Sequence, residues 1–270
     1  MSWLEAIILG LVEGITEFLP ISSTGHLILT QSLLGLKGAA VDRLLIIVQG
    51  AAMLAVCWEF RKKLLDTAFT LHRDAVSRRF VINLFIVSVP LAVLGLLFED
   101  QIKTVLFNPV SVAIALIVGG GVILWAEKRK HTERVQSVDE LTALDAVKLG
   151  LFQALALIPG TSRSGATIIG GLLCGLSRRT AAEFSFFAAL PVLLAATALE
   201  IYKARAEFAT AEVEMLAVSC VVSFISALLA TKFLLRVVSR YSFAGFAWYR
   251  IVFGVVILVT WWQGWVTWAE

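Results

Sequence analysis

The residues best suited to chemistry lie in two short polar clusters within an otherwise apolar chain. In the first cluster, Glu13 and Glu17 are four residues apart, which places both carboxylates on one face of a helix. We expect Pro20 to end that helix. The hydroxyl, small and imidazole residues that follow are Ser22, Ser23, Thr24, Gly25 and His26. Such groups are costly to bury in an apolar environment, so they indicate a functional site.

The carboxylate pair supports more than one role. Glu13 and Glu17 could hold a hard divalent cation such as Mg²⁺ through their oxygens, with substrate phosphates completing the coordination. One of the two could instead act as a general base. A structural alternative is that they form buried ion pairs with Arg163 or Arg250.

Ser23 and His26 are three residues apart in the first turn of the next predicted helix, close enough to hydrogen-bond. A serine needs an adjacent base to become a nucleophile. We therefore expect Ser23 as the candidate nucleophile and His26 as its base, or as the acid that protonates a leaving oxygen. The structural alternative is a buried histidine whose hydrogen bonds are satisfied.

The second cluster, at 159–167, has the composition of an anion-binding loop. Its glycines let backbone N–H groups turn inward, and the N-terminus of the predicted helix 165–176 favours negative charge. Arg163 adds a forked donor set suited to phosphate oxygens; the alternative is an arginine that caps carbonyls. The predicted phosphate-binding residues are Gly160, Thr161, Ser162, Arg163, Ser164 and Thr167, together with Ser22 from the first cluster.

The composition indicates a polytopic membrane protein. Of 270 residues, 59% are hydrophobic and only 16% are charged, whereas a soluble domain is nearer half and a quarter. Six apolar stretches are about long enough to cross a membrane as helices: 41–60, 80–98, 110–126, 184–202, 213–235 and 243–268. The basic residues form no nucleic-acid patch, and three cysteines without metal-like spacing argue against disulfides or a zinc site.

Two further apolar regions, 1–36 and 145–176, are each broken by proline, glycine and hydroxyl residues, so we interpret them as re-entrant hairpins. Segment 9–36 (LGLVEGITEFLPISSTGHLILTQSLLGL) is similar to 149–176 (LGLFQALALIPGTSRSGATIIGGLLCGL). Three spans separate them, which predicts an inverted-topology repeat with a site near the midplane. We expect one membrane domain over 1–270, with repeats at about 1–98 and 145–235, a connecting span at 99–126 and a final span at 243–268.

The distribution of Lys and Arg predicts the orientation. Loops 61–79 and 127–148, together with segments 177–183 and 236–242, carry 15 of the 23 Lys and Arg residues and are expected on the cytoplasmic side. Segments 37–43, 99–109 and 203–212, with both termini, are then expected outside. Runs of small residues permit a homodimer without requiring one.

The motifs EGITEFLPISSTGH and PGTSRSGAT resemble the two signatures of the bacterial undecaprenyl-diphosphate phosphatase family, the integral-membrane type linked to bacitracin resistance. The resemblance extends over essentially the whole chain. It implies an inner-membrane enzyme that removes the terminal phosphate of undecaprenyl diphosphate with Mg²⁺ or Ca²⁺. That reaction recycles the lipid carrier of peptidoglycan synthesis. The resemblance also implies a site that opens to the outer, periplasmic side.

Together these features predict an all-helical membrane phosphatase. We expect Glu13 and Glu17 to hold the cation, Arg163 to clamp the diphosphate, and Ser23 with His26 to carry out the transfer. A metal-bound water is the alternative nucleophile. A polyprenyl-phosphate transporter or flippase is the alternative function, because broken helices in inverted repeats are also typical of transporters.

A phosphatase of the vanadium-haloperoxidase-like type is disfavoured. It needs a second catalytic histidine, and the remaining histidines, His72 and His131, lie in the basic loops.

Overall fold

The computed structural model describes residues 1–204 and 210–265. Within these ranges the chain is helical and forms no β-strand. Six helices are long and apolar enough to cross a membrane: α3 (Ala39–Glu59), α5 (Ala75–Leu106), α6 (Pro109–Lys128), α9 (Arg178–Ala204), α10 (Thr210–Val238) and α11 (Ala244–Trp262). The other helices are α1 (Trp3–Thr16), α2 (Ser23–Leu34), α4 (Arg61–Thr70), α7 (Ala143–Ala154) and α8 (Arg163–Leu173), with the short 3-10 helices η1 (Val138–Glu140) and η2 (Leu155–Leu157).

Each predicted span falls on one of the six long helices, which confirms the membrane class. Helix α5 extends past its apolar stretch at both ends, and a polar residue caps its start. The Asp74 side chain accepts hydrogen bonds from the backbone N–H groups of Val76 and Ser77, so α5 begins before its apolar stretch. The basic segment 61–79, expected as a loop, contains α4. The end of the predicted final span, 266–268, and residues 205–209 of the predicted outer segment lie outside the described residues.

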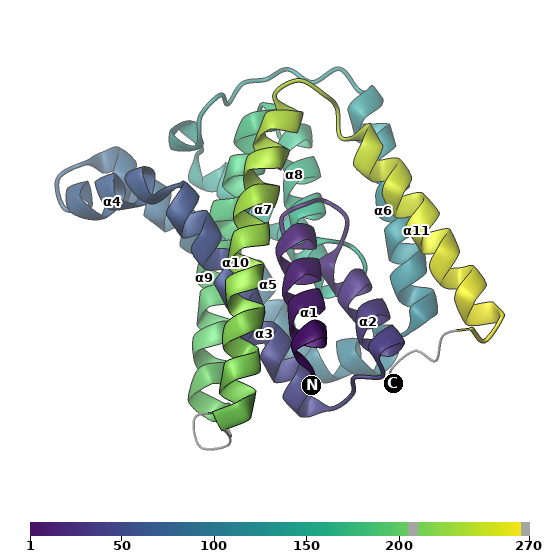
Figure 1. Ribbon diagram of the computed structural model, residues 1–270. Helices are drawn as coiled ribbons and strands as arrows, with labels where there is room; N and C mark the ends of the chain where they lie inside the picture. Colours follow the sequence, from purple (N-terminus) through teal and green to yellow (C-terminus); the bar gives the residue numbers. More distant parts are fainter. Residues whose placement is uncertain (205–209, 266–270) are drawn as a thin grey trace.

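Two helical hairpins meet inside the bundle (Figure 1). Hairpin 1 consists of α1, the turn 17–22 and α2; hairpin 2 consists of α7, η2, the turn 158–162 and α8. In Figure 1 they enter from opposite ends and their tips approach each other near the middle. The Ser164 hydroxyl of hairpin 2 donates to the Leu19 carbonyl of hairpin 1 at 2.9 Å, so the tips are in direct contact. This arrangement is consistent with the predicted re-entrant segments.

The helix packing is reciprocal between the two halves of the chain. Helix α1 packs along α10 of the other half, and α7 packs along α5 of the first half, while α6 pairs with α11. Glycines allow both close approaches: a Cβ on Gly10 would lie 2.4 Å from the Ser219 carbonyl oxygen, and one on Gly150 would lie 2.9 Å from that of Val87. The pairing of each hairpin's first helix with the last long helix of the other half is consistent with the predicted inverted repeat.

An aromatic core supports the tip of hairpin 1. Phe18, which is fully buried, packs edge to face on Phe186 of α9 with ring centroids 5.5 Å apart. Phe187 extends the cluster to Phe60 and Phe80, both in edge-to-face contact. Such pairs prefer defined geometries, so they fix the turn that follows α1.

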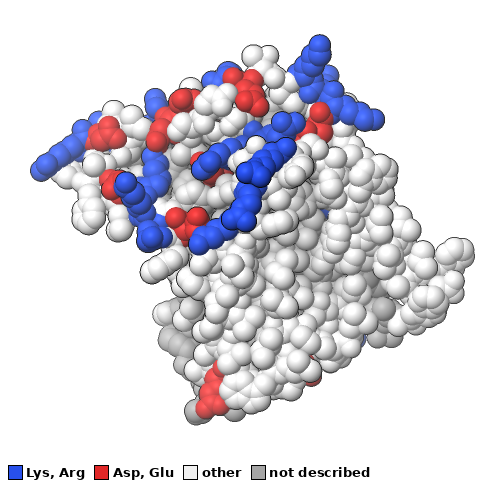
Figure 2. All heavy atoms as spheres, turned by 45° about the horizontal axis from the view of Figure 1, so that its top comes forward, with Lys and Arg blue, Asp and Glu red and all other residues white. Residues whose placement is uncertain are grey.

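Charged residues gather at one end of the molecule. Figure 2 shows Lys and Arg around the end that is uppermost in Figure 1, above a broad belt without charge. Ion pairs join the segments there: Lys63 with Asp139, Arg134 with Asp145, and Arg178 with Glu127. The belt has the apolar surface expected of helices surrounded by lipid.

Candidate active site

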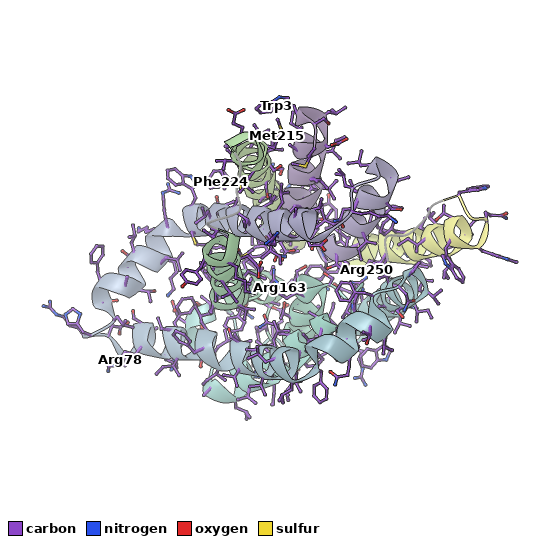
Figure 3. All side chains as sticks on the ribbon, turned by 90° about the horizontal axis from the view of Figure 1, so that it is seen from below. Trp3, Arg78, Arg163, Met215, Phe224 and Arg250 are labelled. Atoms are coloured by element: carbon purple, nitrogen blue, oxygen red, sulfur yellow. The ribbon has the colours of Figure 1, made fainter. Side chains whose placement is uncertain are left out.

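The tips of the two hairpins enclose a cavity of about 170 Å³. Its polar lining comes from both clusters predicted from the sequence and from α3: Glu17, Ser22, Ser23, Gln49, Ser162 and Arg163. Seen from below in Figure 3, Arg163 lies near the middle of the bundle. The two polar clusters therefore form one site, as the repeat predicts.

Glu17 is the centre of the hydrogen-bond network in the cavity. The Ser23 hydroxyl donates to Oε2 at 2.6 Å, and the Gln49 amide donates to the same oxygen at 3.2 Å. Arg163 Nη2 donates to Oε1 at 3.1 Å. Three donors from three elements satisfy the carboxylate, which a buried charge requires. A carboxylate 2.6 Å from a hydroxyl is also within reach to accept its proton.

Protein groups bind the two terminal nitrogens of Arg163 but not its Nε. Its Nη1 donates to the Ser185 carbonyl at 2.9 Å, and its Nη2 binds Glu17. Its Nε has no partner among the described residues, although the side chain is 9% exposed. Because a buried donor without a partner is costly, this N–H is available to an anion in the cavity.

Glu13 lies one helical turn before Glu17 and is fully buried, and neither of its carboxyl oxygens has a partner among the described residues. Two carboxylates are hard oxygen donors, so this pair fits Mg²⁺ or Ca²⁺. The described residues contain no group of three or more His, Cys, Asp or Glu side chains arranged for a metal. A cation held here would therefore take its remaining ligands from substrate or water, as Mg²⁺ commonly does.

Two helix N-termini face the cavity. Ser22 begins α2 and Ser162 begins α8, and they have nearly the same backbone, with φ of 72° and 69°. Each hydroxyl accepts a hydrogen bond from the glycine N–H three residues later, Gly25 or Gly165. A positive φ is unfavourable for serine, and such strain often occurs at functional sites. The positive ends of both helix dipoles favour an anion between them.

The predicted hydrogen bond between His26 and Ser23 is not formed. The Nδ1 of His26 lies 2.7 Å from the Ser22 carbonyl oxygen, and its Nε2 lies 2.7 Å from the Tyr249 hydroxyl on α11. A carbonyl only accepts, so Nδ1 carries a hydrogen, and Nε2 is hydrogen-bonded to the Tyr249 hydroxyl. The expectation was wrong because a side chain in the first turn of a helix points back toward the residue four positions earlier, whereas Ser23 turns to Glu17.

Three of the predicted phosphate-binding residues point away from the cavity. The Ser164 hydroxyl is bound to Leu19, and the Thr167 hydroxyl is bound to the Arg163 carbonyl and the Ser185 hydroxyl. Thr161 lines a separate apolar groove. Ser164 and Thr167 therefore stabilise the hairpin tip, while Ser22, Gly160, Ser162 and Arg163 line the cavity as predicted.

Arg250 is a structural clamp rather than a partner of a glutamate. It is 1% exposed and donates to the Pro20 carbonyl of hairpin 1 at 3.3 Å and to the Gly160 carbonyl of hairpin 2 at 3.1 Å. It also donates to the carbonyls of Ala115 and Leu116 in α6. The guanidinium thus ties both tips to α6 and α11.

The family model of the bacitracin resistance protein BacA matches residues 6–256 of this chain. The chain belongs to the BacA family.

Curated relatives support the family membership, because they match nearly the whole length of this chain. The chain is 55% identical to an undecaprenyl-diphosphatase of Dechloromonas aromatica, over 98% of this chain and 97% of the relative. It is 57% identical to undecaprenyl-diphosphatase 2 of Rhodospirillum rubrum, with the same coverage of both chains. It is also 56% identical to undecaprenyl-diphosphatase 1 of Chromobacterium violaceum, over 98% of both chains. The resemblance carried by the two motifs is confirmed.

Sequence reasoning missed two residues of this BacA-family site. Gln49 donates to Glu17, and its only signal was an amide within the apolar stretch 41–60. Tyr249, which holds His26, lies directly before Arg250 in the last apolar stretch. Neither polar group could be assigned to a partner, because both act across contacts between helices far apart in the chain.

Proposed function

We propose that this chain is an undecaprenyl-diphosphate phosphatase. It hydrolyses the terminal phosphate of undecaprenyl diphosphate to give undecaprenyl phosphate and phosphate. The observation that carries the proposal is the joined hairpin cavity, where Ser23, Glu17 and Arg163 meet. The names of the relatives and of the family support the substrate and a part in bacitracin resistance.

The cavity suits a diphosphate on electrostatic grounds. The free Nε of Arg163 and the N-termini of α2 and α8 supply donors for phosphate oxygens. These donors are held by the protein before substrate binds, so little reorganisation accompanies the reaction. In phosphoryl transfer, positioning and charge neutralisation account for most of the catalysis.

Ser23 is the nucleophile in this proposal, and Glu17 is its base. A bond forms between the Ser23 oxygen and the terminal phosphorus, the bond to the bridging oxygen breaks, and undecaprenyl phosphate leaves. The hydroxyl proton passes to Glu17, its hydrogen-bond acceptor at 2.6 Å. Water then hydrolyses the phosphoserine. If water attacks directly instead, Glu17 keeps the role of base and Ser23 orients the phosphate.

Glu13 and Glu17 are the residues proposed to hold the divalent cation, Mg²⁺ or Ca²⁺. When bound, the cation would neutralise negative charge on the diphosphate oxygens. The proposal is supported by the two oxygens of Glu13, which are buried and accept no hydrogen bond from the described residues.

The reaction is placed at the outer face of the bacterial inner membrane in this proposal. The basic end of the molecule is the end from which hairpin 2 enters, and basic segments favour the cytoplasm. Hairpin 1, which carries both glutamates and Ser23, then enters from the outside.

The test is phosphate release from undecaprenyl diphosphate by the purified protein in detergent. We expect release that EDTA abolishes and that Mg²⁺ or Ca²⁺ restores. Ser23→Ala, Glu17→Gln and Arg163→Lys should each lose at least about 100-fold in kcat/KM, because each removes a direct contact with the reacting groups. Absence of release by the wild-type protein with either cation would favour a transporter instead.

Rapid quenching with substrate labelled on its terminal phosphate separates the two nucleophiles. Label that becomes covalently attached to Ser23 supports attack by the serine. Retained turnover in Ser23→Ala would instead assign the attack to water.

A further inference from the structure

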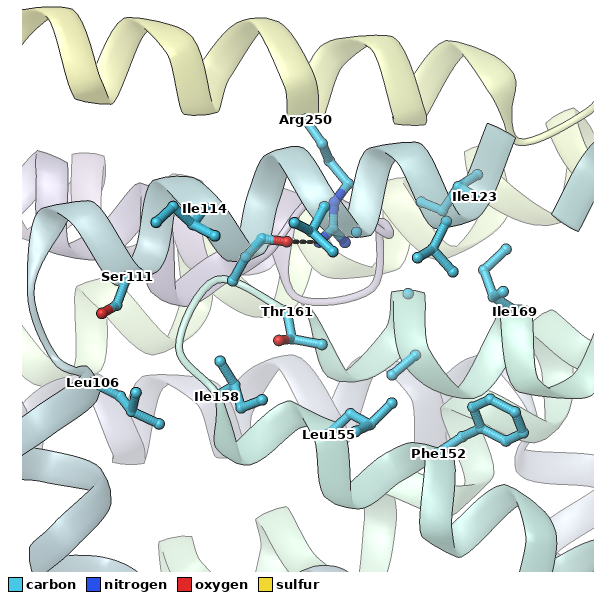
Figure 4. A pocket seen from close by; sticks show the side chains of 16 residues that line it. Leu106, Ser111, Ile114, Ile123, Phe152, Leu155, Ile158, Thr161, Ile169 and Arg250 are labelled. Atoms are coloured by element: carbon cyan, nitrogen blue, oxygen red, sulfur yellow. Dashed lines mark hydrogen bonds between the residues drawn. The ribbon is translucent and has the colours of Figure 1, made fainter. Parts of the chain in front are cut away.

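A second hollow lies on the opposite side of the hairpin 2 tip from the catalytic cavity. This groove, between α6 and hairpin 2, has a volume of about 450 Å³ (Figure 4). Its walls are apolar, with side chains such as Ile114, Val118, Phe152, Leu155 and Ile169. In Figure 4, Ser111 and Leu106 mark one end of the groove, and Ile123 and Ile169 mark the other.

The groove offers no charged group to a ligand. Arg250 reaches its wall, but the guanidinium donates to four backbone carbonyls and is thereby occupied by the protein. The hydroxyls of Ser111 and Thr161 are the remaining polar side-chain groups in its lining. A hydrocarbon chain fits this lining, and a phosphate headgroup does not.

The turn of hairpin 2 forms a thin partition between the groove and the catalytic cavity. Ala156, Gly160 and Ser162 face the cavity, whereas Leu155 and Thr161 face the groove. Ile158 lines both. Ile158 therefore marks the point at which the chain of a molecule with its diphosphate in the cavity would lie nearest to the groove.

The outer rim of the groove is open to the lipid. Ile114, Val118 and Leu155 each line it while remaining about half exposed. From Ser111 to Ile123 the groove follows α6 for about 18 Å, since a helix rises about 1.5 Å per residue. It therefore has room for the first part of an undecaprenyl chain, and the remainder would continue into the bilayer.

We propose that this groove binds the isoprene units next to the diphosphate and so gives the enzyme its selectivity for prenyl diphosphates. The inference rests on the proposed phosphatase function and extends it to the chain of the substrate. Burial of the apolar chain would supply binding energy that positions the diphosphate against Ser23 and Arg163.

The first experiment fills the groove. Val118→Trp places an indole at its wall, and Val221→Trp is the matched control on α10, because Val118 is 57% and Val221 58% exposed. We expect the ratio of kcat/KM for farnesyl diphosphate to that for dimethylallyl diphosphate to fall about tenfold or more in Val118→Trp and to stay unchanged in Val221→Trp. An unchanged ratio in Val118→Trp, or an equal fall in both variants, would overturn the proposal.

The second experiment does not depend on turnover or on the stability of a variant. Wild-type protein is crosslinked to a farnesyl diphosphate analogue that carries a diazirine on its chain. We expect the label on Val118, Ile158 and their neighbours, with protection by undecaprenyl diphosphate but not by phosphatidylglycerol. A label confined to other surfaces, or equal protection by the phospholipid, would make the groove a general lipid contact. Failure of the phosphatase function would instead appear as a lack of phosphate release from every diphosphate.

Discussion

At the scale of single residues, the carboxylate of Glu17 organises the site. It accepts from the hydroxyl of Ser23, the amide of Gln49 and the guanidinium of Arg163. The spacing of Ser23 and His26 suggested a serine–histidine pair, but in the structure Glu17 takes the place of the histidine. His26 is held instead by Tyr249 and by a stacking contact with Phe253, with ring centroids 4.2 Å apart.

Tyr249→Phe tests whether that contact positions His26. The change removes one hydrogen bond, worth about 1 kcal/mol, and leaves the ring stack in place. We expect kcat for undecaprenyl diphosphate to fall about fivefold, with the melting temperature in detergent unchanged. Tyr241→Phe, at an exposed position, serves as the control. If kcat stays at the wild-type value in Tyr249→Phe while His26→Ala is impaired, Tyr249 has no positioning role.

Glu13→Gln tests the proposed cation ligand. Exchanging a charged oxygen ligand for an amide weakens cation binding, so the Mg²⁺ concentration for half-maximal activity should rise about tenfold. At saturating Mg²⁺, kcat should recover most of its value. Glu5→Gln, at the half-buried start of the same helix, is the control, because an amide can still accept the capping hydrogen bond from the Ser2 N–H. A fall in kcat with an unchanged Mg²⁺ requirement would contradict the assignment.

At the scale of the elements, the site depends on helices that approach closely. Helix α1 carries Glu13, ends directly before Glu17 and packs on α10 through Gly10 and Gly14. Helix α8 is held at its far end, where the N–H groups of Arg134 and Val135 both donate to the Gly175 carbonyl. These contacts fix each hairpin from its own end of the molecule, so the tips meet in one position.

Gly14→Ala tests the α1–α10 contact. A Cβ there would lie 2.1 Å from the Ser226 hydroxyl oxygen and 2.4 Å from the Ser223 carbonyl oxygen. We expect a loss of about 1–3 kcal/mol of stability and reduced phosphatase activity, because α1 must shift and carry Glu17 with it. Gly121→Ala, where a Cβ meets nothing within 4 Å, should leave both unchanged. Equal melting temperatures for the two variants would refute the contact.

Asp145 contributes to the stability of the fold in a pH-dependent way. It lies at the basic end of the molecule, outside the six candidate spans. Partial burial acts to raise the pKa of Asp145, but hydrogen bonds from Arg134 and Thr142 outweigh it and hold the pKa below its ordinary value. The stabilisation is therefore present above about pH 4 and is lost as the pH falls further.

Asp145→Asn tests this contribution. Thermal unfolding should show a variant less stable by about 1–2 kcal/mol at pH 7, and this difference should narrow below about pH 4. Asp66→Asn, at an exposed position, is expected to show no difference at either pH. A difference in stability between wild type and Asp145→Asn that is the same at pH 7 and pH 3.5 would contradict this pH-dependent contribution.

At the scale of the whole molecule, charge and packing define two unlike ends. Basic side chains gather at one end, and the hairpins enter from opposite ends (Figures 1 and 2). The packing of α1 on α10 and of α7 on α5 is consistent with the predicted inverted repeat. The two hairpins do not carry the same functional residues, because hairpin 2 has Gln153 at the position where hairpin 1 has Glu13. One site, rather than two, results.

The orientation is tested by labelling cysteines in intact cells, after replacement of Cys57, Cys174 and Cys220 by alanine. Lys37→Cys and His72→Cys are both at exposed positions, on either side of α3. We expect a membrane-impermeant maleimide to label Lys37→Cys in intact cells and His72→Cys only after permeabilisation. The opposite pattern would reverse the orientation and move hairpin 1 to the cytoplasmic side.

The membrane class, the six spans, the two interrupted helical hairpins and the two polar clusters could all be predicted from the amino-acid sequence. These features depend on composition and local chemistry: apolar length, helix-breaking proline and glycine, and the cost of burying polar groups. The sequence also predicts an inverted repeat, because both halves keep similar motifs in similar order, and the helix packing is consistent with it.

The pairing of the polar groups depends on how the helices pack and could not be read from the sequence. Ser23 bonds to Glu17 rather than His26, and Arg250 clamps Pro20 and Gly160 rather than pairing with a glutamate. The groove beside Ile158 exists only because α6 and hairpin 2 pack side by side. Residues far apart in the chain meet through helix packing, and spacing along one helix carries no information about what a distant helix places beside it.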